Sequence, residues 1–447
     1  MTRRPMPRAG SRRGVLARLT LVVLVALVAR ANANSLNANA NSLNAEALYE
    51  SNVLSAAAAP VGGFDHAGWY ANGAWREDWY ERALGTSTGK TVTVNDAVGL
   101  MKALRDPVVE FVLVNATARL DELAAGSSPD AWPEAGVTIT RRITLRGVCE
   151  THSSERCALT AGLRSVMNVV DGGRATVERL TVTGAQSDDF GGAFYFGRGH
   201  GGGRFENVAF VACLAERAGG AVYVSNDANA GNVAFVGVNF TSNRVVAASS
   251  RGGAVYASTE GASRVTFDKC LFDGNDASGG FGGGLYAHGG RVVVNECNFT
   301  GNFAKTGGGA SFRSGGVVSS SIFVDNNATQ DVGGGVHITS ATDIVDGAYA
   351  CAIQRSLFRN NRAVRAGGGL FAYGRARMLA NEFSSNALTG AVNVPAYANL
   401  NDYYACTDMS STGCTLFPTL AADVYDANPD AFDPFTPQSV FASIPSS

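Results

Sequence analysis

The chain has 447 residues, with 36 basic and 38 acidic side chains and a formal net charge of −2 at pH 7. This balance gives no electrostatic basis for binding nucleic acid or an anionic membrane surface, and we expect neither as a partner. The 8 cysteines are an even number, which permits a set of disulfides if the chain is exported.

The N-terminus has the order of a signal peptide. Arginines from Arg3 to Arg18 precede an apolar run from Leu19 to Ala29, and Ala31-Asn32-Ala33 follows as a small-residue cleavage site. We therefore predict a signal peptide over residues 1–31, a secreted or cell-surface location and no integral membrane segment in the mature chain. The pair Arg12-Arg13 also resembles a twin-arginine signal, so either export route is open.

Three further regions flank the centre of the chain. The heptad ANANSLN occurs at Ala31–Asn37 and again at Ala38–Asn44, and residues 32–60 are predicted to form a low-complexity linker. Residues 61–136 are expected to form an N-terminal cap with the first strand. In that cap, 95–105 has the pattern of a short amphipathic helix that could close the end of a solenoid. Residues 396–447 are expected to form a C-terminal cap and tail.

Aromatic residues crowd the predicted N-terminal cap, among them Trp69, Trp75 and Trp79. Exposed aromatic rings can stack on sugars, so these residues are candidates for a glycan-binding patch, while packing within the cap is the alternative.

The central part, expected to span residues 137–395, repeats a two-part motif. Its first part, F-x-x-N, occurs at Phe240–Asn243, Phe272–Asn275, Phe299–Asn302, Phe323–Asn326, Phe358–Asn361 and Phe383–Asn386. A degenerate copy ends in Cys213. The phenylalanines lie 24 to 35 residues apart, which predicts a solenoid with one coil per repeat.

The second part is a glycine cluster before an apolar residue, as in Gly219-Gly220-Ala221-Val222-Tyr223 and Gly308-Gly309-Ala310. Each glycine would cost a helix about 1 kcal/mol relative to alanine, whereas glycine accepts a positive φ at a corner between strands. The pattern therefore predicts an all-β parallel β-helix of about eight to ten coils with a helical cap at its N-terminal end.

Equivalent residues of successive coils should stack about 4.8 Å apart. We expect a column of phenylalanine rings and a column of asparagines whose amides bond to one another and to the backbone, and we interpret both as structural. A small or medium residue lies two positions before each phenylalanine and should point to the same side of the strand. This second column is Val208, Val238, Cys270, Cys297, Ser321, Ser356 and Asn381.

The paired F-x-x-N and GG-[AVL] motifs resemble the repeat of the polymorphic outer membrane protein family, within the pectin-lyase-like superfamily of right-handed parallel β-helices. The resemblance covers about residues 177–390 and implies a surface-exposed adhesive passenger. Bacterial members end in a membrane barrel of at least about eight strands, for which the residues after Asn386 are too few.

The superfamily also contains polysaccharide lyases and glycoside hydrolases. The resemblance to its polygalacturonase-like hydrolases makes Asp188, Asp189 and His200, in the segment Gly199-His200-Gly201, candidate catalytic residues. The flanking motifs of those hydrolases are missing. A calcium-dependent lyase would need clustered carboxylates, for which Asp268 and Asp273 are the nearest candidates.

The sequence shows no metal or cofactor motif, and we expect neither group. Cys149 with Cys157 and Cys406 with Cys414 are the predicted disulfides, while Cys270 and Cys297 could either pair or pack. Glycosylation sequons begin at Asn115, Asn239, Asn298 and Asn327 and are usable only in a eukaryotic secretory route.

Together these patterns predict a non-catalytic extracellular β-helix that serves in adhesion or binds a polysaccharide or surface protein. The alternative is a polysaccharide lyase or glycoside hydrolase of the same superfamily.

Overall fold

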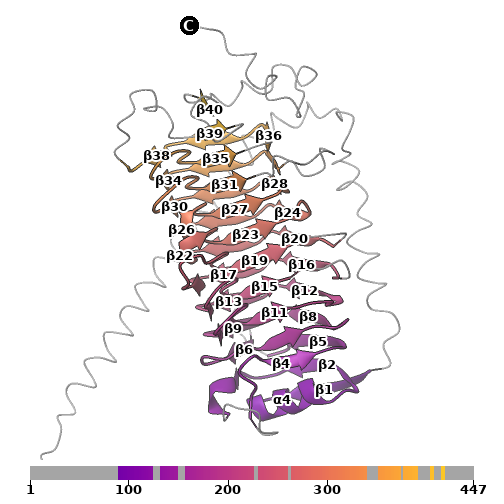
Figure 1. Ribbon diagram of the computed structural model, residues 1–447. Coiled ribbons are helices and arrows are strands. Elements are labelled where there is room, and N and C mark those ends of the chain that lie inside the picture. Colours follow the sequence, from indigo (N-terminus) through magenta and orange to yellow (C-terminus); the bar gives the residue numbers. More distant parts are fainter. Residues whose placement is uncertain are drawn as a thin grey trace, which may run out of the picture. The chain divides into compact units, whose positions relative to one another are not determined.

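The computed structural model describes residues 89–123, 131–149, 157–225, 230–259, 263–339, 351–373, 376–390, 403–406 and 414–417. All the described residues lie within one compact unit, Glu81–Ser447. In this unit, parallel strands stack coil upon coil as a β-solenoid (Figure 1). The predicted right-handed parallel β-helix is confirmed. The tryptophans Trp69, Trp75 and Trp79 lie outside the described residues.

Four sheets, named here A to D in the order in which a coil visits them, run along the solenoid. Sheet A contains β1 (Lys90–Val94), β2 (Val109–Val114), β5 (Arg142–Gly147), β8 (Arg174–Glu178), β12 (Gly202–Glu206), β16 (Val233–Val236), β20 (Val265–Asp268), β24 (Val292–Asn295), β28 (Gly316–Ser319), β32 (Cys351–Gln354) and β36 (Ala376–Leu379). Sheet B contains β3 (Ala118–Arg119), β6 (Cys157–Thr160), β9 (Leu180–Thr183), β13 (Ala209–Val211), β17 (Asn239–Thr241), β21 (Leu271–Asp273), β25 (Asn298–Thr300), β29 (Ile322–Val324), β33 (Leu357–Arg359) and β37 (Glu382–Ser384).

Sheets C and D complete each coil. Sheet C contains β10 (Gln186–Ser187), β14 (Leu214–Ala215), β18 (Arg244–Val245), β22 (Asp276–Phe281), β26 (Phe303–Thr306), β30 (Asn327–Ala328), β34 (Arg362–Ala363) and β38 (Ala387–Leu388). Sheet D contains β4 (Val137–Ile139), β7 (Met167–Val169), β11 (Phe194–Phe196), β15 (Val222–Val224), β19 (Val255–Ser258), β23 (Leu285–His288), β27 (Ala310–Arg313), β31 (Val336–Thr339), β35 (Leu370–Tyr373), β39 (Tyr403–Cys406) and β40 (Cys414–Phe417). Sheet C runs through 8 strands, so about eight coils are complete.

The strand of sheet B is short because a corner bounds it on each side. The corners lie three residues before and two residues after the repeat phenylalanine, and both adopt positive φ, as at Lys269 (φ 54°) and Gly274 (φ 61°) around Phe272. Cys270, two residues before Phe272, lies between the first corner and β21. The side chains of Cys270 and Phe272 both point inward, as expected. The corner at Lys269 separates Cys270 from the straight strand of sheet A.

Phenylalanine rings fill the interior under sheet B. Phe272 stacks on Phe240 at 4.8 Å between ring centroids and on Phe299 at 4.4 Å, with interplanar angles of 16° and 3°. All three side chains are fully buried. Each buried aromatic ring removes a large apolar area from water, and the stacking adds about 0.5–1.5 kcal/mol per pair. The predicted phenylalanine column is therefore confirmed.

The asparagine after the second corner forms a hydrogen-bonded ladder. Asn302 Nδ2 donates to the Phe272 carbonyl at 3.0 Å and to Asn326 Oδ1 at 2.9 Å. The Asn302 amide N–H also donates to Asn326 Oδ1, at 3.0 Å. The same pattern links the other members of the column: Asn243, Asn275, Asn361 and Asn386. These bonds satisfy buried polar groups at a place where the sheet ladder is interrupted.

Glycines form the corner between sheets C and D because two backbones meet there. The first glycine of each cluster, such as Gly307 (φ 68°), adopts positive φ. The next, such as Gly308, leaves no room for a Cβ atom, which would collide with the Gly334 carbonyl and the Asn327 backbone. The glycine motif thus encodes both a backbone conformation and a close approach of neighbouring coils.

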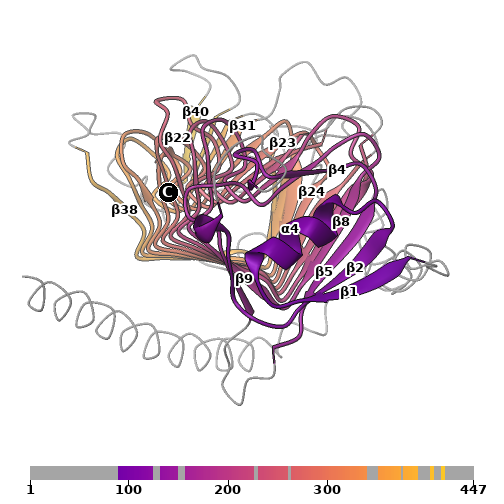
Figure 2. The same ribbon diagram turned by 90° about the horizontal axis from the view of Figure 1, so that it is seen from below.

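Helix α4 (Ala97–Arg105) covers the N-terminal end of the coils, as Figure 2 shows in a view along the axis. Asp96 caps it by accepting a hydrogen bond from the Gly99 amide at 2.7 Å. Leu100, Met101 and Leu104 are buried against the first coil. The expected helical cap is confirmed, and the strands of sheet A already begin at β1. A short 3₁₀ helix, η2 (Leu120–Glu122), follows β3.

The glycine corner predicts a matched pair of substitutions. Gly308→Ala should lower the free energy of unfolding by at least about 3 kcal/mol, because the methyl group has no space. Gly301→Asn should change it by less than about 1 kcal/mol, because nothing lies within 4 Å of a Cβ at Gly301 and Asn360 holds the equivalent corner. Urea titration of both variants tests this. Equal losses in the two variants would contradict the steric explanation.

Candidate functional site

The structure does not bring the candidate catalytic residues together. Asp188 and Asp189 are exposed just before β11, and Asp189 forms an ion pair with Arg217 at 3.4 Å. His200 follows β11 at the opposite end of that strand, is fully buried, and has its Nε2 atom 2.9 Å from the Ser225 carbonyl. The candidate acid and base therefore lie at opposite ends of β11, with the carboxylates exposed and the imidazole fully buried.

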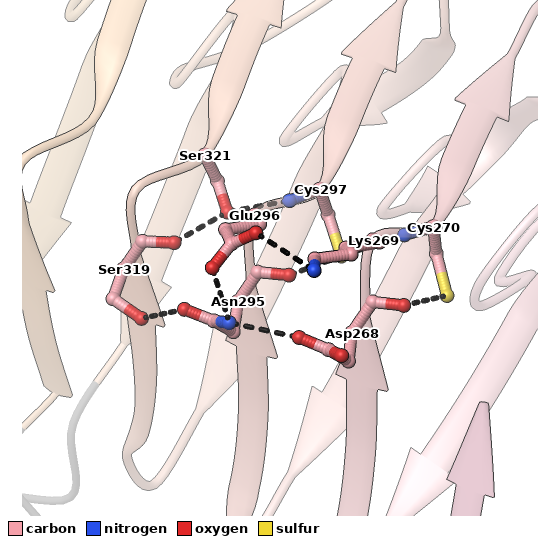
Figure 3. Close-up of polar contacts among 8 residues, drawn as sticks. All are labelled: Asp268, Lys269, Cys270, Asn295, Glu296, Cys297, Ser319 and Ser321. Atoms are coloured by element: carbon pink, nitrogen blue, oxygen red, sulfur yellow. Dashed lines mark hydrogen bonds and ion pairs between the residues drawn. The ribbon is translucent and has the colours of Figure 1, made fainter. Parts of the chain in front are cut away.

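Polar side chains converge instead at the corner between sheets A and B (Figure 3). On the outer face of sheet A, Asn295 Nδ2 donates to Asp268 Oδ1 at 2.8 Å, and Ser319 Oγ donates to Asn295 Oδ1 at 2.9 Å. Parallel pairing places these three residues at equivalent positions of successive coils. Asp268 is only 5% exposed. Its carboxylate is thus engaged in bonding between coils.

A second ladder lies on the inner side of the same corner. Cys297 Sγ contacts the Asn295 carbonyl at 3.2 Å as a donor and accepts the Cys270 amide N–H at 3.3 Å. Ser321 Oγ repeats this pattern, donating to the Ser319 carbonyl at 2.8 Å and accepting the Cys297 amide N–H at 3.1 Å. From Cys297 onward, the column of small residues therefore carries side chains that accept the amide N–H of the preceding coil. Ser356 and Asn381 continue it.

The cysteines of this ladder are free thiols. Burial raises the pKa of the Cys297 thiol well above its usual value, and the neighbouring Cys270 raises it further. The Cys297 thiol therefore stays protonated at neutral pH and is not poised as a nucleophile. Of the two possibilities for this pair, the structure shows packing.

The structure describes the two predicted disulfides to different extents. Cys149 and Cys157 form the expected disulfide, with 5.5 Å between their Cα atoms. Cys406 and Cys414 are register partners in the antiparallel pair β39–β40, although their side chains are outside the described set.

The carboxylates near the corner do not converge on one point. Asp268 belongs to the outer face of sheet A and Asp273 to that of sheet B, where burial raises its pKa. Lys269 and Glu296 occupy the corner itself as an exposed ion pair at 3.6 Å, which contributes little stability. Within the described ranges, no three His, Cys, Asp or Glu side chains are placed to hold a metal ion.

A column of tyrosines covers the outer face of sheet D. Tyr195, Tyr223, Tyr256 and Tyr286 are register partners in successive coils. Their rings stack with centroid separations of 5.3, 4.6 and 5.4 Å and interplanar angles of at most 14°. The ring faces are therefore turned toward one another along the axis.

Residues of the glycine corner pack over this column. Phe190 lies 4.6 Å from Tyr223 between ring centroids, and Phe281 lies 6.3 Å from Tyr286. The Arg217 guanidinium is 5.9 Å from the Phe190 centroid, and that of Arg251 is 5.5 Å from Tyr286. We call this set, with the four tyrosines, the aromatic patch.

Exposure varies along the aromatic patch. Tyr256 and Tyr286 are 8% and 4% exposed, whereas Phe190, Tyr195 and Tyr223 are half-buried. Burial, and for Tyr195 also the charge of Asp189, raises the pKa of the Tyr195 and Tyr223 hydroxyls. The accessible end of the patch therefore offers neutral phenol groups beside the Arg217–Asp189 ion pair. Asp189 thus borders the patch, in a role different from the predicted catalytic one.

The sheet D column continues through Ser311 to a buried histidine, His337. His337 Nδ1 lies 3.0 Å from Ser311 Oγ, and Nε2 lies 3.1 Å from Thr339 Oγ1. Its ring stacks on Phe371 at 5.8 Å. Burial lowers the pKa of His337 to about 4, so the ring is neutral at physiological pH.

Sequence reasoning missed the aromatic patch, although a signal was present. In Gly219-Gly220-Ala221-Val222-Tyr223, the residue after the inward valine must point outward in a strand, and a tyrosine recurs there at Tyr256 and Tyr286. An aromatic residue repeated at an outward position marks either a covered face or a binding face.

No protein-family model matches the chain, and a search of curated proteins finds no significant match. No helix among the described residues is both long enough and apolar enough to span a membrane.

The inner ladder predicts which cysteine substitutions are tolerated. Cys297→Ser should change the free energy of unfolding by less than about 1 kcal/mol, because serine makes the same bonds at Ser321. Cys297→Ala leaves the buried Cys270 amide without its acceptor and should cost about 1–3 kcal/mol more. Urea titrations compare the two variants. If alanine proves as stable as serine, the ladder contributes nothing at this position.

The burial of His337 should make the folded protein less stable in mild acid. Its folded pKa is about 4 and its unfolded value about 6.5, so its contribution is complete above pH 6.5 and is lost as the pH falls toward 4. The expected loss is about 3 kcal/mol. His337→Phe, which keeps the ring stack, should remove this part of the pH dependence. Urea titrations between pH 7 and pH 4 test it, and identical profiles for both proteins would contradict it.

Proposed function

We propose that this chain is a secreted or cell-surface, non-catalytic β-helix that binds an extended extracellular polysaccharide through the aromatic patch. The observation that supports this proposal is the tyrosine column on sheet D, with Tyr195 and Tyr223 accessible and in register. A ligand that lies along the solenoid axis would meet an equivalent side chain about every 4.8 Å.

The chemistry of the patch suits such a ligand. Because the ring faces stack on each other, Tyr195 and Tyr223 can offer a ligand only their ring edges and hydroxyl groups, and the hydroxyl groups can exchange hydrogen bonds with sugar hydroxyls. Tyrosine and arginine are both enriched at protein interfaces, and tyrosine offers a large contact area with few rotatable bonds. The rigid stack limits the entropy lost on binding.

The proposed absence of catalysis has its own support. The candidate acid and base are separated by β11, the Asp268 carboxylate takes part in a ladder between coils, and the buried Cys297 thiol stays protonated. Each of these groups therefore has a structural explanation that does not require a catalysed reaction.

A screen of plant, algal and bacterial polysaccharides tests this function. We expect retention of the mature protein on at least one matrix without release of reducing ends or unsaturated uronides in the same wells. Product release would contradict the non-catalytic proposal, and clean elution from every matrix would contradict binding.

Substitutions within the patch locate the binding surface. The double variant Tyr195→Phe and Tyr223→Phe keeps the ring stack but removes both hydroxyls, and it should weaken binding roughly tenfold. Tyr286→Phe is the matched control, because that side chain is 4% exposed and should not affect binding. Unchanged binding by the double variant would place the ligand elsewhere.

A further inference from the structure

The asparagines of the repeats fall into two classes with opposite surroundings. Ladder members such as Asn275 and Asn302 are fully buried, and each Nδ2 atom donates two hydrogen bonds. Asn239 and Asn298 instead begin strands β17 and β25 of sheet B and point away from the core. Their side chains are partly exposed and take no part in either ladder.

Strand geometry completes a modification signal at both outward asparagines. In Asn239-Phe240-Thr241 and Asn298-Phe299-Thr300, the central ring points inward, so the asparagine and the threonine two residues later share the outer face. Only β21 separates the two strands. The same acceptor sequence thus stands twice on one face, about 10 Å apart at two strand spacings.

The surrounding face leaves room for a bulky group. The register partner of both asparagines is Leu271, which is itself only partly buried, and Ala209 and Ile322 occupy the same column in the flanking coils. No described segment crosses the outer side of sheet B, which faces outward along the whole solenoid (Figure 2).

We infer that Asn239 and Asn298 carry N-linked oligosaccharides, which places the chain in a eukaryotic secretory route. The donor is a lipid-linked oligosaccharide. A bond forms between Nδ2 and the anomeric carbon of the sugar, the bond from that carbon to the pyrophosphate oxygen breaks, and the lipid pyrophosphate leaves with the electron pair as the amide loses one proton.

Glycans on sheet B would restrict which faces a partner can approach. Each coil visits the sheets in the order A, B, C and D, so sheets B and D lie on opposite sides of the solenoid (Figure 2). Sugar chains on sheet B would shield that side and leave the aromatic patch on sheet D accessible. The inference rests on the extracellular location in the proposed function but does not depend on ligand binding by the patch.

The test is peptide mapping of the mature protein purified from its own cells. Enzymatic release of N-glycans converts a modified asparagine to aspartate, and we expect this mass change at both Asn239 and Asn298. Absence of the change at either residue would overturn the inference, even if Asn115 or Asn327 were modified.

Three threonine variants, expressed in the same cells, provide the controls. Thr241→Val and Thr300→Val keep the β-branched shape but remove the hydroxyl that the modification requires, so each should lose one oligosaccharide from the intact mass. Thr183→Val, in the same outward column but outside any sequon, should lose none. A modified protein that binds no polysaccharide would contradict only the proposed function, and an unmodified protein that binds would contradict only this inference.

Discussion

Register between successive coils is the constraint on which this structure depends. A parallel pair places each residue beside its equivalent in the next coil. The same kind of side chain therefore recurs along the axis and must be able to pack against, or bond to, copies of itself. Stacked phenyl rings and asparagines meet this condition, because each ring has two faces and each amide both donates and accepts. A one-residue slip would turn Phe272 toward solvent and break the bonds between Asn275 and Asn302 at once.

The inner ladder at the corner between sheets A and B meets the same condition with different residues. Cysteine, serine and asparagine occur at one column because each presents an acceptor to the amide of the preceding coil. Side-chain identity is therefore less restricted here than at the asparagine ladder, where only a carboxamide can make all four bonds. A sequence comparison that scores residue similarity would not group Cys297 with Asn381, although both side chains accept the amide N–H of the preceding coil.

The fold was predictable from sequence because its determinants recur. Phe272, Asn275 and the glycine clusters repeat at a recognisable spacing, and the amphipathic pattern near Leu100 marked the cap. The two corners flanking each phenylalanine were not predicted, because residues as different as Lys269, Glu296 and Arg355 hold the same positive φ. The candidate site was harder still. Whether Tyr223 is covered or accessible depends on Phe190 and Arg217, which approach it from the glycine corner, and no local pattern encodes that packing.

The two corners around sheet B also keep the length of the segment between them constant. They stand five residues apart in every coil from Arg179 and Gly184 to Ala380 and Ser385. All variation in coil length falls elsewhere, chiefly between the glycine corner and sheet A, as the paths from Gly307 to Ser320 and from Gly333 to Arg355 illustrate. Insertions and deletions therefore fall mainly on one edge of the solenoid, where new loops can be acquired or lost while every ladder keeps its spacing. That edge is where related chains could diverge in what they recognise without changing how they fold.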